Sequence, residues 1–398
     1  MPGPMPLDGV IVADFSRVLA GPLATVTLAD LGADVIKVER AGSGDDTRQW
    51  GPPWTDNSSS YFESANRGKR SIALDFDDPA DLDLAHRLAA RADVLVENFL
   101  PGTLDRFGLD YGSVRKANPG VVYASITGFG SGAGSHLAGY DFLIQAVGGL
   151  MDITGPPDVP SKVGVAIVDV LTAKDATVAI LAALHERSRS GQGQYLEVAL
   201  LTSLLAALVN QGSAYLATGH SPHSLGNRHP SIAPYETLRT GDGVLALAIG
   251  NNAQFARLCE VLDADDLAAD PRFASNAQRV THRDALATAL ESRLLTDSAA
   301  SWAARLMDAG LPAGTIGTVA DGFALAERLG LSPRAPVAEG TDQIRSPLRF
   351  DRTPITRYRR PPRFDEHGDD IRRWLAADAD TPAHSTGSSE GEARGIPA

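Results

Sequence analysis

The chain has 398 residues, 43% of them hydrophobic, a length that one hydrophobic core seldom organises, so two domains are expected. Its formal charge of −13 argues against nonspecific nucleic-acid binding, which needs a basic surface. Cys259 is the single cysteine and the nine histidines have no HExxH-type spacing, so disulfides and metal sites are not expected and a cytoplasmic, reducing location is favoured. Charges interrupt every apolar run before membrane-spanning length, and the N-terminus lacks the pattern of a signal peptide.

The first 200 or so residues alternate short apolar runs with helical patterns, which predicts an α/β fold with a parallel sheet. Strands are expected at VIVADF (10–15), DVIKVE (34–39), RSIALDF (70–76), DVLVENF (93–99) and VVYASITGF (121–129). Helices are expected at PLATVTLADLGA (22–33), DPADLDLAHRLAARA (78–92) and TAKDATVAILAALHERSRSG (172–191), the last one ended by Gly191.

The segment YLEVALLTSLLAALVNQGSAYLAT (195–218) is long and apolar, and we expect one buried or intersubunit helix there. HSPHSLGNRHPSIAPY (220–235) is rich in turn-forming residues and is typical of a connector. A smaller second domain is expected to contain a strand at 243–252 and helices at 254–270 and 283–295. PPRFDEHGDDIRRWLAA (361–377) predicts a last helix that returns to the first domain, and the tail from Asp378 predicts disorder.

Asp169 interrupts an apolar run, with Val168 before it and Val170 and Leu171 after it. The residues allow two interpretations. The carboxylate could cap the start of a helix, which stabilises by about 1 kcal/mol. It could instead be a nucleophile that an apolar environment keeps poorly hydrated.

The first strand-to-helix turn, FSRVLAGP (15–22), belongs to a candidate site because ligands of α/β sheets bind at the carboxyl ends of strands. The turn is not GxGxxG. Glu39 resembles the ribose-binding acid of NAD enzymes, but Arg40 follows it directly and the glycine turn is missing. An NAD-dependent oxidoreductase is therefore disfavoured.

Several cations near strand ends form either a solvated face or, as a group, a site for a phosphorylated ligand: Lys37, Arg40, Arg67, Lys69, Arg70 and Arg106. Asn98 and Phe99 lie at the carboxyl end of the strand expected at 93–99. An amide beside an aromatic ring can line a site for a flat ligand, and an ordinary strand-to-helix loop has the same composition.

An ordered set of segments from Leu7 to Leu375 resembles the family III coenzyme A transferases, the CaiB/BaiF family. The likeness is particularly close to the succinyl-CoA:dicarboxylate branch, including succinate–hydroxymethylglutarate transferases. The segments that carry it are LDGVIVADFSRVLAGPLATVTLADLGADVIKVERAGSGDDTRQWGPP, NRGKRSIALDF, ADVLVENFLPGTLDRFGL, VVYASITGFG, AGYDFLIQAVGGLMDITG, ALHERSRSGQGQ, GNRHPSIAPYETL and AIGNNAQF.

The resemblance implies that Asp169 is the catalytic nucleophile, which forms an anhydride with the donor acyl group and then an aspartyl-CoA thioester. CoA and acyl-CoA are then substrates, and no permanent cofactor or metal is expected. The implied CoA-binding set is Val18 and Ala20 in the first turn, Arg40 near the adenine, Leu74, Asn98, Phe99 and Arg106 along the nucleotide channel, and Tyr140 near the thioester.

Differences from related sequences restrict which acyl substrates and which reaction are expected. Leu19 stands where formyl-CoA:oxalate members carry glutamine, and their glycine-rich lid is not visible, which argues against those substrates. Gly139-Tyr140-Asp141 replaces the GHD segment of α-methylacyl-CoA racemases on the same fold, and Asn251 replaces their glutamate. Tyrosine and amide side chains are poor bases near neutral pH, so transfer is favoured over racemisation. An inactive CoA-binding homologue stays an alternative.

The expected acyl group is dicarboxylic, with Arg48, Arg228 or His229 available for its distal carboxylate. The resemblance also implies a Rossmann-like large domain, a smaller α/β domain and an interlocked homodimer. From the net charge and the interrupted apolar runs, we expect no nucleic-acid or membrane partner. We expect the following boundaries: 1–210 for the first part of the large domain, 211–234 for a linker, 235–320 for the small domain, 321–345 for a second linker, 346–377 for the return to the large domain and 378–398 for the tail.

Overall fold

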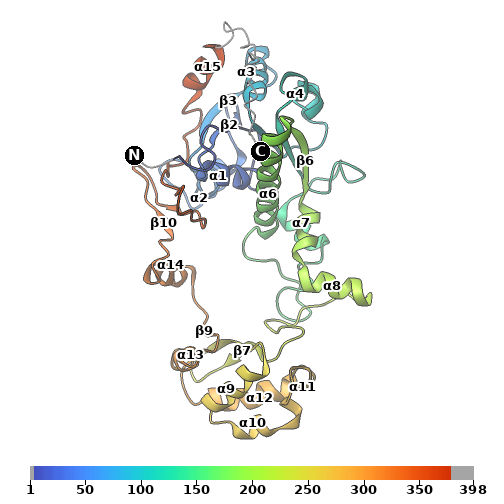
Figure 1. The fold of residues 1–398 in the computed structure, drawn as a ribbon, viewed down its shortest axis with the longest axis vertical. Helices are drawn as coiled ribbons and strands as arrows, with labels where there is room; N and C mark the ends of the chain where they lie inside the picture. Colours follow the sequence, from blue (N-terminus) through green and yellow to red (C-terminus); the bar gives the residue numbers. More distant parts are fainter. Residues whose placement is uncertain (1–3, 378–398) are drawn as a thin grey trace, which may run out of the picture.

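The computed structural model describes residues 4–377, so the prediction for the tail lies outside the described residues. Figure 1 shows a large lobe built around a parallel sheet and a small lobe at the opposite end of the molecule. Two separate stretches of the chain connect the lobes, one leaving α8 (Val209–Thr218) and one returning through α14 (Val319–Arg328). No single helix among the described residues is long and apolar enough to cross a membrane, although the bent pair of α7 (Leu200–Ala207) and α8 reaches that length and hydropathy when taken together.

Six parallel strands form the sheet of the large lobe, in the order β3-β2-β1-β4-β5-β6. The expected α/β class with a parallel sheet is thus confirmed. The strand order reverses between β1 and β4, which is where ligands of open α/β sheets bind. The strands are β1 Ile11–Asp14, β2 Asp34–Arg40, β3 Arg70–Leu74, β4 Val94–Glu97, β5 Val122–Thr127 and β6 Gln194–Ala199.

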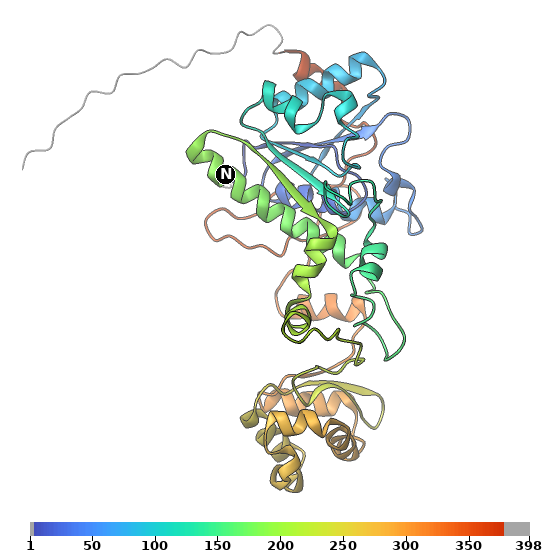
Figure 2. The same ribbon diagram turned by 90° about the vertical axis from the view of Figure 1, so that its right-hand side faces the viewer.

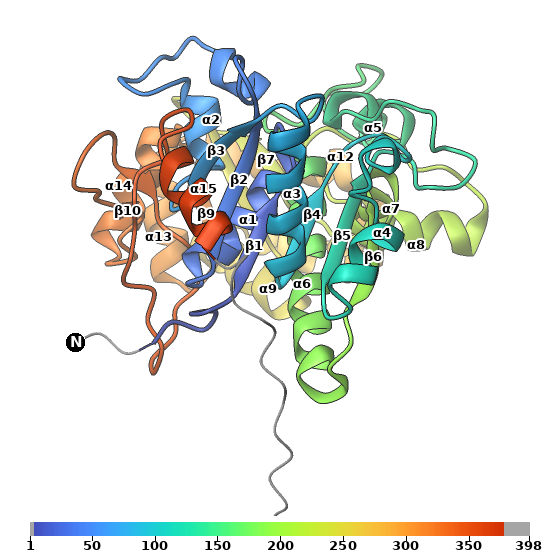
Figure 3. The same ribbon diagram turned by 90° about the horizontal axis from the view of Figure 1, so that it is seen from above.

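Helices cover both faces of this sheet, as Figure 3 shows, and this explains why β4 and β5 are buried along their whole length. One core contains α1 (Ala20–Asp30), α5 (Asp141–Val147) and α6 (Ile167–Ser190). The other contains α3 (Pro79–Arg91), α4 (Tyr111–Ala117) and the C-terminal α15 (Gly368–Ala377). Ile371 and Leu375 of α15 are fully buried beside α3 and β3, so the end of the chain packs on the sheet that its beginning forms.

The expectation of one helix over 195–218 is wrong. The segment forms strand β6, then α7 (Leu200–Ala207) and α8 (Val209–Thr218), with a bend of 83° between the helices and a positive φ of 44° at Val209. The start of the segment alternates in exposure: Tyr195 and Glu197 face outward, while Leu196 and Val198 pack against the core. This period of two is a strand signal that the overall apolar character of the segment conceals.

The small lobe has its own hydrophobic core and an antiparallel sheet of β7 (Tyr235–Arg239), β8 (Val244–Ala248) and β9 (Ala313–Thr315). The single helix expected at 254–270 is two helices, since Asp263 adopts φ 49° between them. The helices of this lobe are α9 Asn252–Val261, α10 Asp265–Ala269, α11 Asn276–Thr281, α12 Arg283–Leu294 and α13 Ala299–Asp308. The chain then returns through α14 (Val319–Arg328) and the short pair β10 (Arg334–Ala335) and β11 (Gln343–Ile344).

Candidate active site

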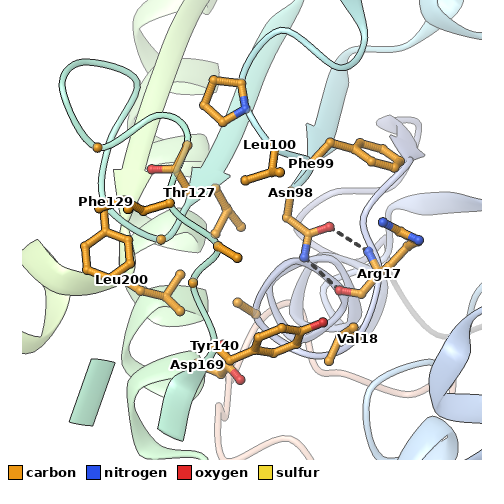
Figure 4. Close-up of a pocket in the computed structure, with 18 of the residues that line it drawn as sticks. Arg17, Val18, Asn98, Phe99, Leu100, Thr127, Phe129, Tyr140, Asp169 and Leu200 are labelled. Atoms are coloured by element: carbon orange, nitrogen blue, oxygen red, sulfur yellow. Dashed lines mark hydrogen bonds between the residues drawn. The ribbon is translucent and has the colours of Figure 1, made fainter. Parts of the chain in front are cut away.

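A cavity of about 270 Å³ opens at the carboxyl ends of β1, β4 and β5, where the strand order reverses (Figure 4). Its wall comes from six separate parts of the chain: the turn after β1, the segment after β2 that carries Asp46, the loop after β4, the segment from the end of β5 to α5, the first turn of α6 and the first residue of α7. Its lining includes Arg17–Ala20, Asp46, Asn98–Pro101, Ile126–Gly130, Leu137–Tyr140, Asp169 and Leu200.

Six of the nine residues expected in the site line this one cavity: Val18, Ala20, Asn98, Phe99, Tyr140 and Asp169. The other three lie outside it. Leu74 is buried in the core at the end of β3, and Arg40, its partner in the register, is exposed at the end of β2. Arg106 lies over the Phe107 ring at 4.3 Å from its centroid. The CoA-binding roles of all these residues stay predictions.

The turn after β1 has a strained backbone that Asn98 holds in place. Val18 has φ 68°, an unusual value for a β-branched residue. On one side of it, the Arg17 N–H donates to Asn98 Oδ1 at 2.8 Å, and Asn98 Nδ2 donates to the Arg17 carbonyl at 2.7 Å. The Val18 N–H donates to Asp45 Oδ2 at 3.3 Å. The Asn98 amide is therefore used in positioning the turn, a role that its place beside Phe99 did not reveal.

This turn leads into α1, whose N-terminus faces the cavity. Leu19 precedes the helix and forms no side-chain cap, and both Leu19 and Ala20 line the cavity. The backbone N–H groups of a helix's first turn have no partner within the helix and carry partial positive charge. The β1 turn thus gives the cavity an end suited to negative charge.

Buried lysine and aspartate side chains form a network beside the same turn. Lys37 Nζ lies 2.8 Å from Asp45 and donates to the Ser16 carbonyl at 3.0 Å, and Lys69 Nζ lies 2.9 Å from Asp14. Burial alone would raise the pKa of Asp45, but the Lys37 ammonium outweighs it and holds that pKa at about 2. Burial lowers the pKa of Lys69 to about 8, against the opposing effect of the Asp14 carboxylate. The two lysines are buried and hold carboxylates within the core, so for them neither the solvated face nor the phosphate site considered for these cations fits the structure.

Asp169 is the third residue of α6, and Ala166 occupies the capping position, so the interpretation of Asp169 as an N-cap is wrong. Among the described residues its carboxylate has no hydrogen-bond partner, although it is partly buried. Burial, and secondarily the negative charge of Asp141, raises the pKa of Asp169 to about 7. The desolvation of this carboxyl group therefore outweighs the stabilisation that the N-terminus of α6 offers to an anion.

Asp141 holds the start of α6 next to this acid. Its Oδ1 accepts from the Val168 N–H at 2.8 Å, and its Oδ2 accepts from Gln145 Nε2 at 2.8 Å. In the sequence, Asp141 stood out only as the end of the Gly139-Tyr140-Asp141 segment. Its spacing of four residues from Gln145 could have indicated that the two side chains interact, since residues i and i+4 meet on one face of a helix.

Two further features near the site were not predicted from the sequence. Tyr61, on α2 (Ser60–Ser64), has a pKa raised to about 12, first by burial and then by the charges of Asp169 and Asp141, so its phenol lies within electrostatic range of both acids. Gly128 and Gly139 meet backbone to backbone, and a Cβ on Gly128 would lie 2.6 Å from the Cα of Gly139. This close approach ties both ends of the loop that carries Leu137, Ala138 and Tyr140 into the cavity wall.

None of the three residues proposed for a distal carboxylate lines the cavity. Arg48 donates twice to Glu39 at 2.7 Å and lies over the Phe62 ring. Arg228, in the small lobe, pairs with Glu236 at 3.0 Å and Asp284 at 2.7 Å. The Nδ1 atom of His229 accepts from the Ser231 N–H at 3.0 Å. Arg48 and Arg228 thus already bind carboxylates of the protein itself.

The chain is similar to known proteins over nearly its full length. A family model described as CoA-transferase family III matches residues 7–368. The succinate–glutarate CoA-transferase of Agrobacterium fabrum is 43% identical over 375 residues, which cover 91% of this chain and 94% of that protein. The succinyl-CoA:glutarate CoA-transferase of Mus musculus is 44% identical over 326 residues, covering 81% of this chain and 75% of that protein.

A solved structure of a CaiB/BaiF family protein from Brucella suis superimposes with a TM-score of 0.84 at 46% identity, covering 94% of this chain and 100% of that one. The agreement in sequence and the agreement in fold thus extend over both lobes. The chain belongs to the CoA-transferase family III, the CaiB/BaiF proteins, and is a CoA-transferase.

Proposed function

We propose that this enzyme moves CoA from succinyl-CoA, or a closely related dicarboxylyl-CoA, to a free dicarboxylic acid, and that Asp169 carries the acyl group between them. One observation supports this assignment above the others. Asp169 presents a partly buried carboxylate without a hydrogen-bond partner among the described residues to the cavity at the switch point of the sheet. A carboxylate that only stabilised the fold would be paired or capped, as Asp14, Asp45 and Glu39 are.

The proposed reaction exchanges one activated acyl bond for another. A carboxylate oxygen of Asp169 attacks the thioester carbonyl of the donor, the C–S bond breaks, and CoA leaves as thiolate from a mixed anhydride. The thiolate attacks the aspartyl carbonyl, which releases the donor acid and forms an aspartyl-CoA thioester. The acceptor carboxylate then displaces CoA to form a second anhydride. The thiolate finally attacks the acceptor carbonyl, which frees Asp169 and the new acyl-CoA.

The environment of Asp169 suits this chemistry. Val168 is buried, and the surrounding wall of Ile126, Phe129 and Leu200 is apolar. Such a wall weakens hydration of the carboxylate and keeps water from the anhydride. The same burial raises the pKa of Asp169 to about 7. At neutral pH, roughly half of the enzyme therefore holds the nucleophile in its unprotonated form.

The proposed substrates follow from the relatives. Both curated relatives described above are named for succinate or succinyl-CoA and glutarate, so succinyl-CoA and glutarate are the first pair to test. Leu19 lines the cavity at the position where formyl-CoA:oxalate members carry glutamine, which supports an acyl group other than formyl or oxalyl.

The quaternary structure and domain boundaries are part of the same proposal. Exposed apolar side chains on α7 and α8, namely Leu205, Val209 and Leu216, support burial of this surface in the homodimer that the family resemblance implies. The small core formed by residues between Ala233 and Leu311 supports a small domain near 235–320.

Racemisation finds less support. Asn251, which stands where racemases of this fold have a glutamate, lies outside the cavity and caps α9 by accepting from the Gln254 N–H at 2.9 Å. A second base opposite Asp169 is therefore not provided by that residue.

The decisive experiment is incubation with succinyl-CoA, glutaryl-CoA, acetyl-CoA and formyl-CoA, each with free glutarate, succinate or oxalate as acceptor. Borohydride or hydroxylamine trapping followed by peptide mass spectrometry then locates the acyl-enzyme. We expect transfer from succinyl-CoA and a modified peptide containing Asp169. Transfer without modification of Asp169 would refute the covalent mechanism, and absence of transfer from every dicarboxylyl-CoA would refute the substrate class.

A further inference from the structure

We propose that Arg17 is a specificity residue that binds a phosphate group of the CoA portion of the substrate, at the end of the cavity away from Asp169. The inference rests on the proposed function in one respect, which is that a CoA thioester places its reacting end at Asp169. Arg17 was not among the cations that the sequence pattern singled out, because it lies inside the β1 turn and not at the end of an apolar run.

The cavity needs a positively charged side chain if it is to bind an anionic ligand, because two of its lining residues are aspartates. Three charged side chains line it, Arg17, Asp46 and Asp169, and Arg17 is the cation among them. Two carboxylates in a partly enclosed site repel phosphate groups unless a positive charge lies nearby. Arg17 is therefore the lining residue that can pair with them.

The hydrogen-bonding groups of Arg17 are not used up by the protein. Its Nε is buried and has no hydrogen-bond partner in the described part of the chain. Its Nη1 lies 3.7 Å from Asp46, beyond hydrogen-bond distance, and the two side chains are 32% and 46% exposed. A guanidinium group has five N–H donors, and a buried donor without an acceptor is unfavourable. An incoming phosphate would supply that acceptor.

Three other cations near the β1 turn already pair with carboxylates, which distinguishes Arg17 from them. They bind carboxylates at 2.7 to 2.9 Å with side chains that are buried: Lys37 with Asp45, Lys69 with Asp14 and Arg48 with Glu39.

The backbone of Arg17 is held in place before any ligand arrives, and its guanidinium group lies against an aromatic ring. Asn98 holds both its backbone N–H and its carbonyl, and the guanidinium carbon lies 4.9 Å from the centroid of the Phe99 ring. A planar donor held in this way can meet two phosphate oxygens at once, with little further loss of side-chain freedom.

The direction of Arg17 favours a phosphate over the distal carboxylate of the acyl group. Figure 4 shows its side chain pointing away from Asp169, toward Phe99 and beyond Asn98. A short dicarboxylic acyl group bonded to a thioester at Asp169 stays near Asp169. The phosphates of CoA lie on the other side of the thioester, beyond the pantetheine arm, and therefore extend toward Arg17.

The test measures binding of free CoA, by calorimetry, to the full-length enzyme and to four variants over a range of salt concentrations. Arg17→Gln removes the charge, Arg17→Lys keeps it but loses the fork, and Asp46→Asn removes the competing carboxylate. Arg115→Gln is the matched control, because Arg115 is an exposed arginine on α4 outside the cavity. Dephospho-CoA, which lacks the 3′-phosphate, serves as a second ligand.

We expect Arg17→Gln to weaken CoA binding by about ten-fold or more and to make it less salt-dependent, as the loss of one ion pair with a phosphate requires. Arg17→Lys should bind with intermediate affinity, Asp46→Asn should bind CoA more tightly, and Arg115→Gln should resemble the unmodified enzyme. If Arg17→Gln weakens dephospho-CoA equally, the contact is with the diphosphate. If the loss is confined to CoA, the contact is with the 3′-phosphate.

Two results would overturn the inference: unchanged CoA affinity in Arg17→Gln, or weaker binding with an unchanged salt dependence, which indicates a purely structural role. Failure of the proposed function is recognised separately. It would appear as full transferase activity in Asp169→Asn, a variant in which the binding of free CoA can still be compared with that of Arg17→Gln.

Discussion

The carboxylate of Asp141 accepts a hydrogen bond of 2.8 Å from the backbone N–H of Val168, the residue directly before Asp169. One acid thereby positions the helix turn that carries the other, while its negative charge adds to the burial that raises the pKa of Asp169. The same residue therefore affects both the position and the protonation of the proposed nucleophile, and the two effects can be separated by experiment.

Replacing Asp169 with asparagine should reduce transfer from succinyl-CoA by about a thousand-fold or more, because the amide cannot form the acyl-enzyme. The measurement is the initial rate of CoA transfer with fresh protein, checked by mass spectrometry for deamidation. Asp175→Asn is the matched control, since Asp175 is an exposed aspartate on the same helix. Equal losses in the two variants would point to a disturbed helix.

The pH profile of kcat/KM should show an acidic limb with an apparent pKa near 7, with activity rising as Asp169 loses its proton. Asp141→Asn removes a neighbouring negative charge, so the pKa of Asp169 should fall and the limb should move to lower pH. A drop in rate at every pH, with the limb in place, would mean that Asp141 acts only by holding α6.

Asn98→Ala should destabilise the protein by about 1–3 kcal/mol, since the two polar groups of Arg17 that it satisfies lose their partners. We also expect KM for the acyl-CoA to rise more than kcat falls, because the β1 turn shapes the cavity while Asp169 stays on a separate helix. Urea unfolding and steady-state kinetics check the two expectations. Native stability and native KM in Asn98→Ala would show that the β1 turn keeps its conformation without the hydrogen bonds from Asn98.

Gly139→Ala should raise KM and lower stability, because the new Cβ would meet the backbone of Gly128, which cannot move aside as a side chain could. Gly132→Ala is the control within the same loop, where a Cβ meets nothing within 4 Å. Thermal unfolding and KM for succinyl-CoA compare the pair. Similar behaviour of both variants would mean that the loop tolerates displacement at its base.

Local patterns were enough to predict the main elements of the large lobe. The runs that became β1 to β5 are apolar, short and bounded by turns, and the helices at 22–33 and 78–92 alternate with them, so the α/β class followed from residues that are neighbours in sequence. Ordered segments along the chain also indicated the family. Asp169 stood out because an isolated carboxylate in an apolar run is costly and therefore uncommon, but only the family resemblance favoured a nucleophile over a helix cap.

The tertiary structure decided how those residues interact. The sequence made Arg48 a candidate for ligand binding, but in the structure it pairs with Glu39. Arg17 lines the cavity, and its Nε has no partner in the described part of the chain. The contact between Gly128 and Gly139 and the hydrogen bond from Val168 to Asp141 also join residues 11 and 27 positions apart. Such contacts depend on how separate segments pack in space, whereas periodicity and composition report only on the segment in which they occur.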